Sequence, residues 1–255
     1  MLKTTINLQH GKKIYFASDQ HFGAPNPKES KVREEKFIRW LSEIKNDAQV
    51  LFLMGDLFDF WHEWKHVIPK GYVRVLGKIA ELKDSGIHVY FFVGNHDLWM
   101  KDYLEEEIGC TVFYKKQYFQ IAGKEFLLAH GDGLGPGDKG YKRMKKVFTN
   151  PFAQWAFRWL HPDIAMKMAL YLSQKNKMIS GEEDKAFLGE DKELLIIYSK
   201  KKLQTEKIDY FIYGHRHLPM VLDLEGKAKY INLGDWISYF TFGVFDGEFH
   251  LKTFE

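Results

Sequence analysis

Seven side chains in this 255-residue chain have the types and the spacing of metal ligands. They are Asp19, His21, Asp56, Asn95, His130, His215 and His217. In two of the clusters the ligands are two residues apart, so both side chains point to the same side of an extended segment. Oxygen and nitrogen donors without sulfur suit divalent manganese, iron or zinc. Seven donors with one carboxylate shared predict two cations about 3.5–4 Å apart, the spacing of two-metal hydrolytic sites.

Charge indicates which substrate class such a site would take. Two divalent cations outweigh the two carboxylates Asp19 and Asp56, and imidazole binds metal only when it is neutral. The remaining positive field attracts an anion, for which phosphate is the natural candidate, and a water activated between the cations could attack phosphorus in line. His96, next to Asn95 in the sequence, is placed to protonate a leaving oxygen or to stabilise charge on the phosphoryl group.

Each of these clusters follows a short apolar run that is rich in aromatic and β-branched residues. The runs cover residues 14–17, 50–54, 89–93, 126–129, 210–213 and, before the less telling pair Gly234-Asp235, 230–231. Such runs predict strands buried on both faces. Ligands bind just beyond the carboxyl ends of such strands, so one site is expected to be assembled from many strand ends. Asp59 and Asp97, in the same clusters, are candidate outer acceptors that orient imidazole rings.

Helical patterns separate the first strands. Apolar residues recur at helical spacing over residues 37–44 and 73–80. Strand, helix, strand order at this length predicts βαβ units, an α/β fold and a largely parallel beginning to the sheet. A chain of this length fits a single domain over residues 1–255, with room for an inserted cap.

Residues 133–206 interrupt the later strands and are expected to form that helical cap. After a glycine-rich start, Phe148, Phe152, Trp155 and Trp159 lie on one helical stripe, and a second helical pattern runs over residues 163–176. Apolar surface of this kind could bury fatty acyl chains, at about 0.8 kcal/mol per CH₂. It could equally pack against the domain, and its interleaved lysines fit either an anionic membrane face or a solvated surface.

Composition limits the other possibilities. The formal net charge of +3 is too small to imply a nucleic-acid partner. Cys110 is the only cysteine, which excludes an intrachain disulfide and a cysteine-rich zinc site. Residues 1–13 lack an apolar signal core, and no apolar stretch is long enough to span a bilayer. We therefore expect a cytoplasmic protein.

The clusters together resemble the motif set of the calcineurin-like metallophosphoesterases. Its blocks are Asp-x-His at residues 19–21, Gly-Asp-x-x-Asp at 55–59, Gly-Asn-His-Asp at 94–97, a single His at 130 and Gly-His-x-His at 214–217. All five blocks are present and in order, from residue 19 to residue 217. The resemblance implies a two-sheet β-sandwich flanked by helices. It also implies two divalent metal ions, with manganese expected.

The same resemblance implies how the ligands divide between the metals. One metal takes Asp19, His21, Asp56 and His217, the second takes Asn95, His130 and His215, and Asp56 bridges the two. His96 and Asp56 are the expected catalytic residues.

Within that superfamily the chain is most similar to the hydrolases that act on UDP-2,3-diacylglucosamine in lipid A biosynthesis. The similarity is carried by residues 55–61, 130–134 and 138–141, and by the aromatic insertion with its polar stretch at 173–177. It implies cleavage to UMP and 2,3-diacylglucosamine 1-phosphate. The basic, aromatic insertion suits peripheral contact with the inner membrane leaflet, and no obligate protein partner is implied. The implied substrate contacts are Asn95, His96, Asp138, Tyr141, Asn176 and His215. Many members carry Arg where this chain has His96.

Two rival functions stay open at this point. The first is another dinuclear-metal phosphoesterase, acting on a nucleotide, a phosphoprotein or a nucleic-acid phosphodiester. The second is a catalytically silent scaffold used for protein binding, which lost ligands would reveal. None of the seven candidate ligands is lost here.

Overall fold

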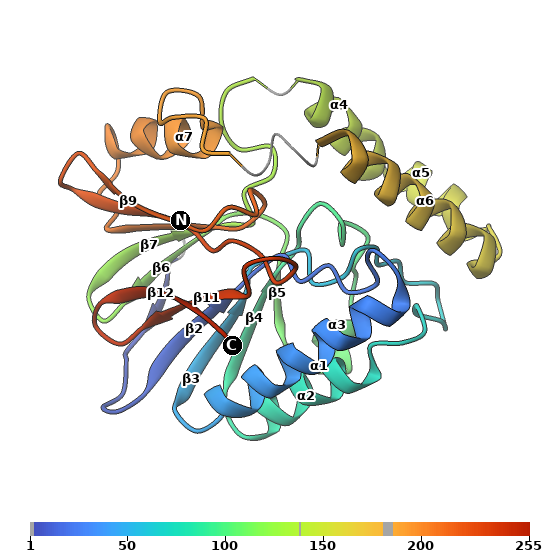
Figure 1. The fold of residues 1–255 in the computed structure, drawn as a ribbon, viewed down its shortest axis with the longest axis horizontal. Helices are drawn as coiled ribbons and strands as arrows, with labels where there is room; N and C mark the ends of the chain where they lie inside the picture. Colours follow the sequence, from blue (N-terminus) through green and yellow to red (C-terminus); the bar gives the residue numbers. More distant parts are fainter. Residues whose placement is uncertain (1–2, 138, 181–185) are drawn as a thin grey trace.

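Two six-stranded sheets, packed face to face, form the centre of the molecule (Figure 1). The structure is a computed structural model that describes residues 3–137, 139–180 and 186–255, and for residues 174–180 it describes the backbone alone. The family-based expectation of a two-sheet sandwich flanked by helices is thus confirmed. None of the helices in the described ranges combines the length and apolarity needed to cross a bilayer.

The first half of the chain builds one sheet from parallel strands joined by helices. Its strand order is β12-β11-β2-β3-β4-β5. The strands are β2 (Lys13–Ala17), β3 (Ala48–Leu53), β4 (His88–Phe92), β5 (Thr111–Phe113), β11 (Thr241–Phe245) and β12 (Phe249–Thr253). Strands β2 to β5 are parallel, as predicted, and β11 and β12 add antiparallel partners at one edge. Helices α1 (Pro27–Ile44), α2 (Val73–Asp84) and α3 (Tyr103–Glu106) belong to this half.

The second sheet is mixed and comes mostly from the later part of the chain. Its strand order is β1-β6-β7-β8-β10-β9. The strands are β1 (Thr4–Ile6), β6 (Gln117–Ile121), β7 (Lys124–Leu128), β8 (Tyr210–Tyr213), β9 (Met220–Leu224) and β10 (Ala228–Asn232). The parallel neighbours β7 and β8 end at the same edge, so the residues that follow them come together.

Successive side chains along each strand point to opposite faces of the sheet. On β2 and β3, Phe16 and Phe52 point into the space between the sheets, whereas Tyr15 and Leu51 pack under α1 and α2. On the outer face of the second sheet lies α7 (Leu194–Leu203), whose Ile196 is buried there. This order of layers, from α7 through both sheets to α1 and α2, is visible in Figure 1.

Three further helices stand to one side of these layers (Figure 1). They are α4 (Lys139–Phe148), α5 (Pro151–Arg158) and α6 (Pro162–Ser180), here called the cap helices. Aromatic contacts join them to the domain: the Trp99 ring lies 4.4 Å from that of Phe157 between centroids, and the Trp99 indole N–H donates to the Phe148 carbonyl at 2.6 Å. His62 packs against the same Phe157 ring. The cap helices therefore overlie loops that follow β3 and β4.

Candidate metal centre

Residues that follow five strands, from both sheets, meet at one place. Asp19 and His21 follow β2, Asp56 follows β3, Asn95 follows β4, His130 follows β7, and His215 and His217 follow β8. Three groups of acidic and histidine side chains at this place are close enough to hold a metal ion. The expectation that a site forms from many strand ends agrees with this arrangement.

Asp19, His21 and His217 form the first group. The Nε2 atoms of the two histidines face each other at 3.2 Å, and Asp19 Oδ1 lies 3.2 Å from His217 Nε2. Asp19 Oδ1 is buried and has no hydrogen-bond partner among the described residues. Burial opposes ionisation of Asp19, but the neighbouring His217 and His21 hold the pKa of this carboxyl well below its usual value. A buried carboxylate oxygen beside two converging imidazole nitrogens fits a divalent cation.

Asp56 connects this group to a second one. Its Oδ2 atom lies 3.5 Å from His21 Nε2 and 3.3 Å from His130 Nε2. Asn95 Oδ1 lies 3.1 Å from the same His130 nitrogen. His215 belongs to none of the three groups, but its ring lies 5.2 Å from that of His130 between centroids. Candidate metal ligands thus lie on two sides of Asp56, as is required of a carboxylate shared by two metal ions.

The far nitrogens of three ligand rings are held by outer acceptors. Asp59 Oδ1 lies 3.3 Å from His21 Nδ1, Asp235 Oδ2 lies 3.4 Å from His217 Nδ1, and the Met54 carbonyl lies 2.9 Å from His130 Nδ1. Such acceptors fix the tautomer and the orientation of a metal-binding imidazole. Asp59 therefore lies where its predicted role requires. Asp235 was missed, although its position after the strand at 230–231 was the available signal.

The prediction for Asp97 is wrong. Its carboxylate accepts the backbone N–H groups of Leu57 at 3.1 Å and Gly94 at 2.5 Å. It therefore fixes the two loops that present Asp56 and Asn95, and it does not orient an imidazole.

Backbone conformation at the candidate ligands is unusual. Five of them have φ between 46° and 65°: Asp19, His21, Asp56, His215 and His217. Residues with a Cβ are uncommon in this left-handed region, and they persist there only where the surroundings hold them. Gly214 shows how tight the surroundings are, because a Cβ there would overlap Ser18 Oγ and Asp19 Oδ2.

His96, which is predicted to protonate a leaving oxygen or to stabilise phosphoryl charge, lies beside the cluster of candidate ligands. Its backbone N–H donates to Asp56 Oδ1 at 2.8 Å, and its Nδ1 lies 2.8 Å from the Asp59 carbonyl. A carbonyl can only accept, so Nδ1 carries a proton, and Nε2 can donate to a substrate oxygen when the ring is the doubly protonated imidazolium. The imidazole of His96 packs edge-on against that of His21, with 4.6 Å between centroids. His96 is thus directed at the same place as the ligands.

The other predicted substrate contacts are only partly described. Tyr141, on α4, donates its hydroxyl to Asp132 at 2.5 Å, and its ring lies 6.1 Å from that of His215 between centroids. Asp138 lies outside the described residues, and so does the side chain of Asn176.

An apolar pocket of about 200 Å³ lies between this cluster and the cap helices. Its lining includes Asn95 and His96 on the domain side and Phe157 and Met168 on the cap side. Ser173, also in the lining, donates to Asp59 Oδ2 at 2.9 Å. A polar cluster with an adjoining apolar pocket suits a substrate that has an anionic part and an apolar part.

The chain is similar to known phosphoesterases along most of its length. Residues 12–219 match the family model described as calcineurin-like phosphoesterase. A UDP-2,3-diacylglucosamine hydrolase of Porphyromonas gingivalis is 36% identical, with 92% of this chain and 94% of that protein covered. One from Edwardsiella ictaluri is 28% identical over 87% of this chain and 83% of that protein. A solved dimetal phosphatase from Danio rerio has a TM-score of 0.44 at 12% identity, covering 96% of this chain and 99% of that one.

Proposed function

The chain belongs to the calcineurin-like phosphoesterase family, and on that premise we propose that it hydrolyses UDP-2,3-diacylglucosamine to UMP and 2,3-diacylglucosamine 1-phosphate. The observation that carries this proposal is the apolar pocket beside Asn95 and His96. The 36% identical relative that carries the name of this activity supports it.

We assign the seven ligands to two divalent cations, with manganese proposed as the metal. Asp19, His21 and His217 would hold one cation, Asn95, His130 and His215 the other, and Asp56 both. When bound, such a pair supplies Lewis-acid polarisation of the phosphoryl oxygens and activation of water.

The chain's own groups would then orient and stabilise the diphosphate. As an imidazolium, with its Nδ1–H donated to the Asp59 carbonyl, His96 would donate its Nε2–H to a phosphoryl or leaving oxygen. Tyr141 and His215, whose rings lie near each other, are proposed to contact the substrate, as are Asp138 and Asn176. The apolar pocket would exclude water from one side of the reacting phosphate and take part of an acyl chain.

Filling the pocket gives the direct test. With Mn²⁺ present, the wild-type protein should release UMP from UDP-2,3-diacylglucosamine in detergent micelles. Ala169→Phe, which places a ring in the pocket lining, should lower kcat/KM for this lipid about tenfold or more, a size typical of one lost pocket contact. Hydrolysis of a small aryl phosphodiester should stay near the wild-type rate.

Tyr171→Ala is the matched control, because Tyr171 lies on the same helix with its side chain exposed. No UMP release from the wild type, with the aryl diester still cleaved, would remove the lipid substrate and favour another phosphoesterase activity. No hydrolysis of either compound would remove the phosphoesterase assignment itself.

We also propose that the cap helices contact the inner membrane leaflet, which would make this a peripheral protein on the cytoplasmic side. Phe152 is 72% exposed and Trp159 is 76% exposed, and Trp155 and Ile164 are exposed on the same helices. Large apolar side chains so exposed mark an interaction surface more often than a solvated one.

Replacing two of these rings should weaken membrane binding. Trp155→Ser/Trp159→Ser should lower partition into vesicles of phosphatidylglycerol and phosphatidylethanolamine about tenfold or more, since burying one large apolar side chain is worth about 1.5–3 kcal/mol. Sedimentation with the vesicles measures the bound fraction. Val221→Ser, at another exposed apolar residue that lies outside the cap helices, should bind as the wild type does. Equal partition of all three proteins would contradict the proposed membrane contact.

A further inference from the structure

The ligands Asp19 and His21 lie on a short segment, residues 19–24, here called the metal loop. The N–H groups of Asp19, His21 and Phe22 donate to the backbone after β3, at 2.9–3.0 Å. One side of the metal loop is therefore paired with the neighbouring loop. The Phe22 carbonyl accepts the Asp59 N–H of the same neighbouring loop at 2.9 Å, but the carbonyls of Gln20, His21 and Ala24 do not pair there, and buried carbonyls need donors from elsewhere.

Arg33, on α1, supplies most of those donors. Its Nε donates to the Gln20 carbonyl at 2.9 Å, and its Nη2 donates to the carbonyls of His21 at 2.7 Å and Ala24 at 2.5 Å. The side chain is 7% exposed, and in the described part of the chain no carboxylate forms an ion pair with it. Burial lowers the pKa of Arg33. A charged group held this deep without a direct counter-ion is costly, so a specific use for it is expected.

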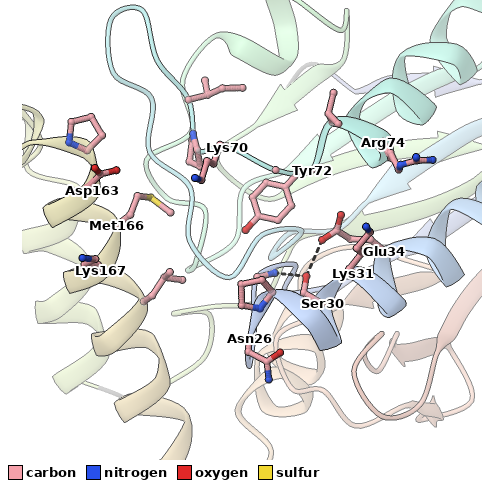
Figure 2. Close-up of a pocket in the computed structure, with 18 of the residues that line it drawn as sticks. Asn26, Ser30, Lys31, Glu34, Lys70, Tyr72, Arg74, Asp163, Met166 and Lys167 are labelled. Carbon is pink, nitrogen blue, oxygen red and sulfur yellow. Dashed lines mark hydrogen bonds between the residues drawn. The ribbon is translucent and has the colours of Figure 1, made fainter.

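Two smaller side chains complete the support of the metal loop. The Tyr72 hydroxyl donates to the Phe22 carbonyl at 3.2 Å, and the Gly23 N–H donates to Ser30 Oγ at 2.7 Å. Ser30 in turn donates to Glu34 at 2.9 Å, and Figure 2 shows these side chains at the edge of a hollow between α1 and α6. Every residue from 20 to 24 thus has a backbone group held by a side chain behind the loop.

Among these contacts, those of Arg33 matter most for His21, because two of its carbonyl acceptors lie on either side of the His21 Cα atom. The Gln20 carbonyl lies in the peptide plane before the Cα atom of His21, and the His21 carbonyl lies in the plane after it. One guanidinium therefore fixes both planes, and the two planes define the backbone conformation of His21. That conformation is left-handed, with φ at 46°, and a histidine without such support would relax toward the ordinary regions.

We propose that Arg33 is a positioning residue of the metal centre, which holds His21 in the left-handed conformation that points its imidazole at Asp19 and His217. This inference rests on the proposed metal centre and is independent of the lipid substrate. It requires the planar fork of arginine, because a lysine ammonium on a flexible chain cannot donate to two peptide planes in a fixed geometry.

Stepwise Mn²⁺ binding tests the proposal. Calorimetry on the wild type should resolve two binding steps. In Arg33→Lys and Arg33→Ala one step should weaken about 10–100-fold, the usual cost of losing an outer support of a metal ligand, while the other step is unchanged. Arg39→Ala is the control, because Arg39 is an exposed arginine on the same helix. Thermal unfolding of the metal-free proteins is measured beside it, to separate metal affinity from stability.

Chemical rescue adds a readout that a general loss of stability would not move. The hollow in Figure 2 has a volume of about 870 Å³ and is lined by Gly23, Ser30 and Tyr72, so it adjoins the space that Arg33→Ala would open. Millimolar guanidinium should restore the weakened step in Arg33→Ala, and an equal concentration of methylammonium should not.

The possible results are distinct. Two normal binding steps in Arg33→Lys, or equal weakening of both steps together with early unfolding, would overturn the positioning role and leave the proposed function intact. A wild type that binds metal but releases no UMP would remove the lipid substrate only. A wild type that takes up no Mn²⁺ would refute the metal centre, and with it the role of Arg33.

Discussion

Asp56→Asn is expected to stop turnover while the fold remains. Asp56 is buried, and its Oδ2 atom lies 3.3–3.5 Å from two ligand nitrogens that belong to different halves of the site. Asparagine keeps the shape and still accepts the His96 N–H at Oδ1, but it removes the charge and can turn an NH₂ group toward both imidazoles. We expect kcat to fall by at least ~10³-fold, more than the ~10–100-fold that an outer partner costs.

Metal content and stability separate this effect from misfolding. Elemental analysis should find fewer than two Mn²⁺ per chain in Asp56→Asn. The metal-free variant should be somewhat less stable than the metal-free wild type near neutral pH but should still unfold cooperatively. Burial opposes ionisation of Asp56, but the neighbouring His130 and His96 hold the pKa of this carboxyl well below its usual value, so its charge stabilises the folded state.

Asp47→Asn serves as the control for Asp56→Asn. Asp47 is a carboxylate far from the site that pairs with Lys13 and Tyr15, so its loss should leave metal content and kcat unchanged. Two bound cations with wild-type turnover in Asp56→Asn would contradict the assignment of a shared carboxylate.

Much of the site could be predicted from the sequence because its signals are local. Each ligand cluster follows a buried strand within a few residues, and the strand pattern is visible in any short window, as for residues 50–54 before Asp56. Parallel order then brings the carboxyl ends together. The candidate ligands could therefore be identified without any knowledge of long-range contacts.

The sequence could not show which way a side chain points, or which segments far apart in the chain pack together. Asp59 and Asp97 occur in similar clusters, yet one faces an imidazole and the other faces two backbone N–H groups. Helix α7 falls within the segment expected to form the cap, but it packs on the outer face of the second sheet. Such differences depend on contacts between segments far apart in the chain.

Arg33 is an instructive intermediate case. It lies four residues before Phe37 on the buried stripe of α1, which continues through Leu41 and Ile44. A charged residue on an otherwise apolar stripe is a visible anomaly in the sequence. Its partners are backbone carbonyls of the metal loop. A sequence pattern does not indicate which backbone carbonyls a side chain will contact.

His96→Ala should slow hydrolysis without removing the metals. Its side chain is no ligand in the proposed assignment, and its backbone N–H to Asp56 remains in the variant. Loss of a positioned donor of this kind costs about 10²–10³-fold in kcat. Mn²⁺ content should stay at the wild-type value, and His88→Ala, at an exposed histidine, should change neither quantity.

The pKa of the leaving group determines whether His96 is needed as a general acid or as a donor that stabilises charge on the phosphoryl group. In a diphosphate the leaving group is itself a phosphate, whose second pKa is about 6, so it departs as a stable anion and gains little from a proton. We therefore expect the imidazolium of His96 to donate its Nε2–H to the phosphoryl oxygens, and His96→Ala to lose the same factor on the diphosphate and on aryl phosphodiesters of differing leaving-group pKa. A loss that grows steadily as the leaving group becomes more basic would identify His96 as the general acid instead. Wild-type rates on all of these substrates would exclude both roles, because a donor aimed at the reacting phosphate cannot be removed without cost.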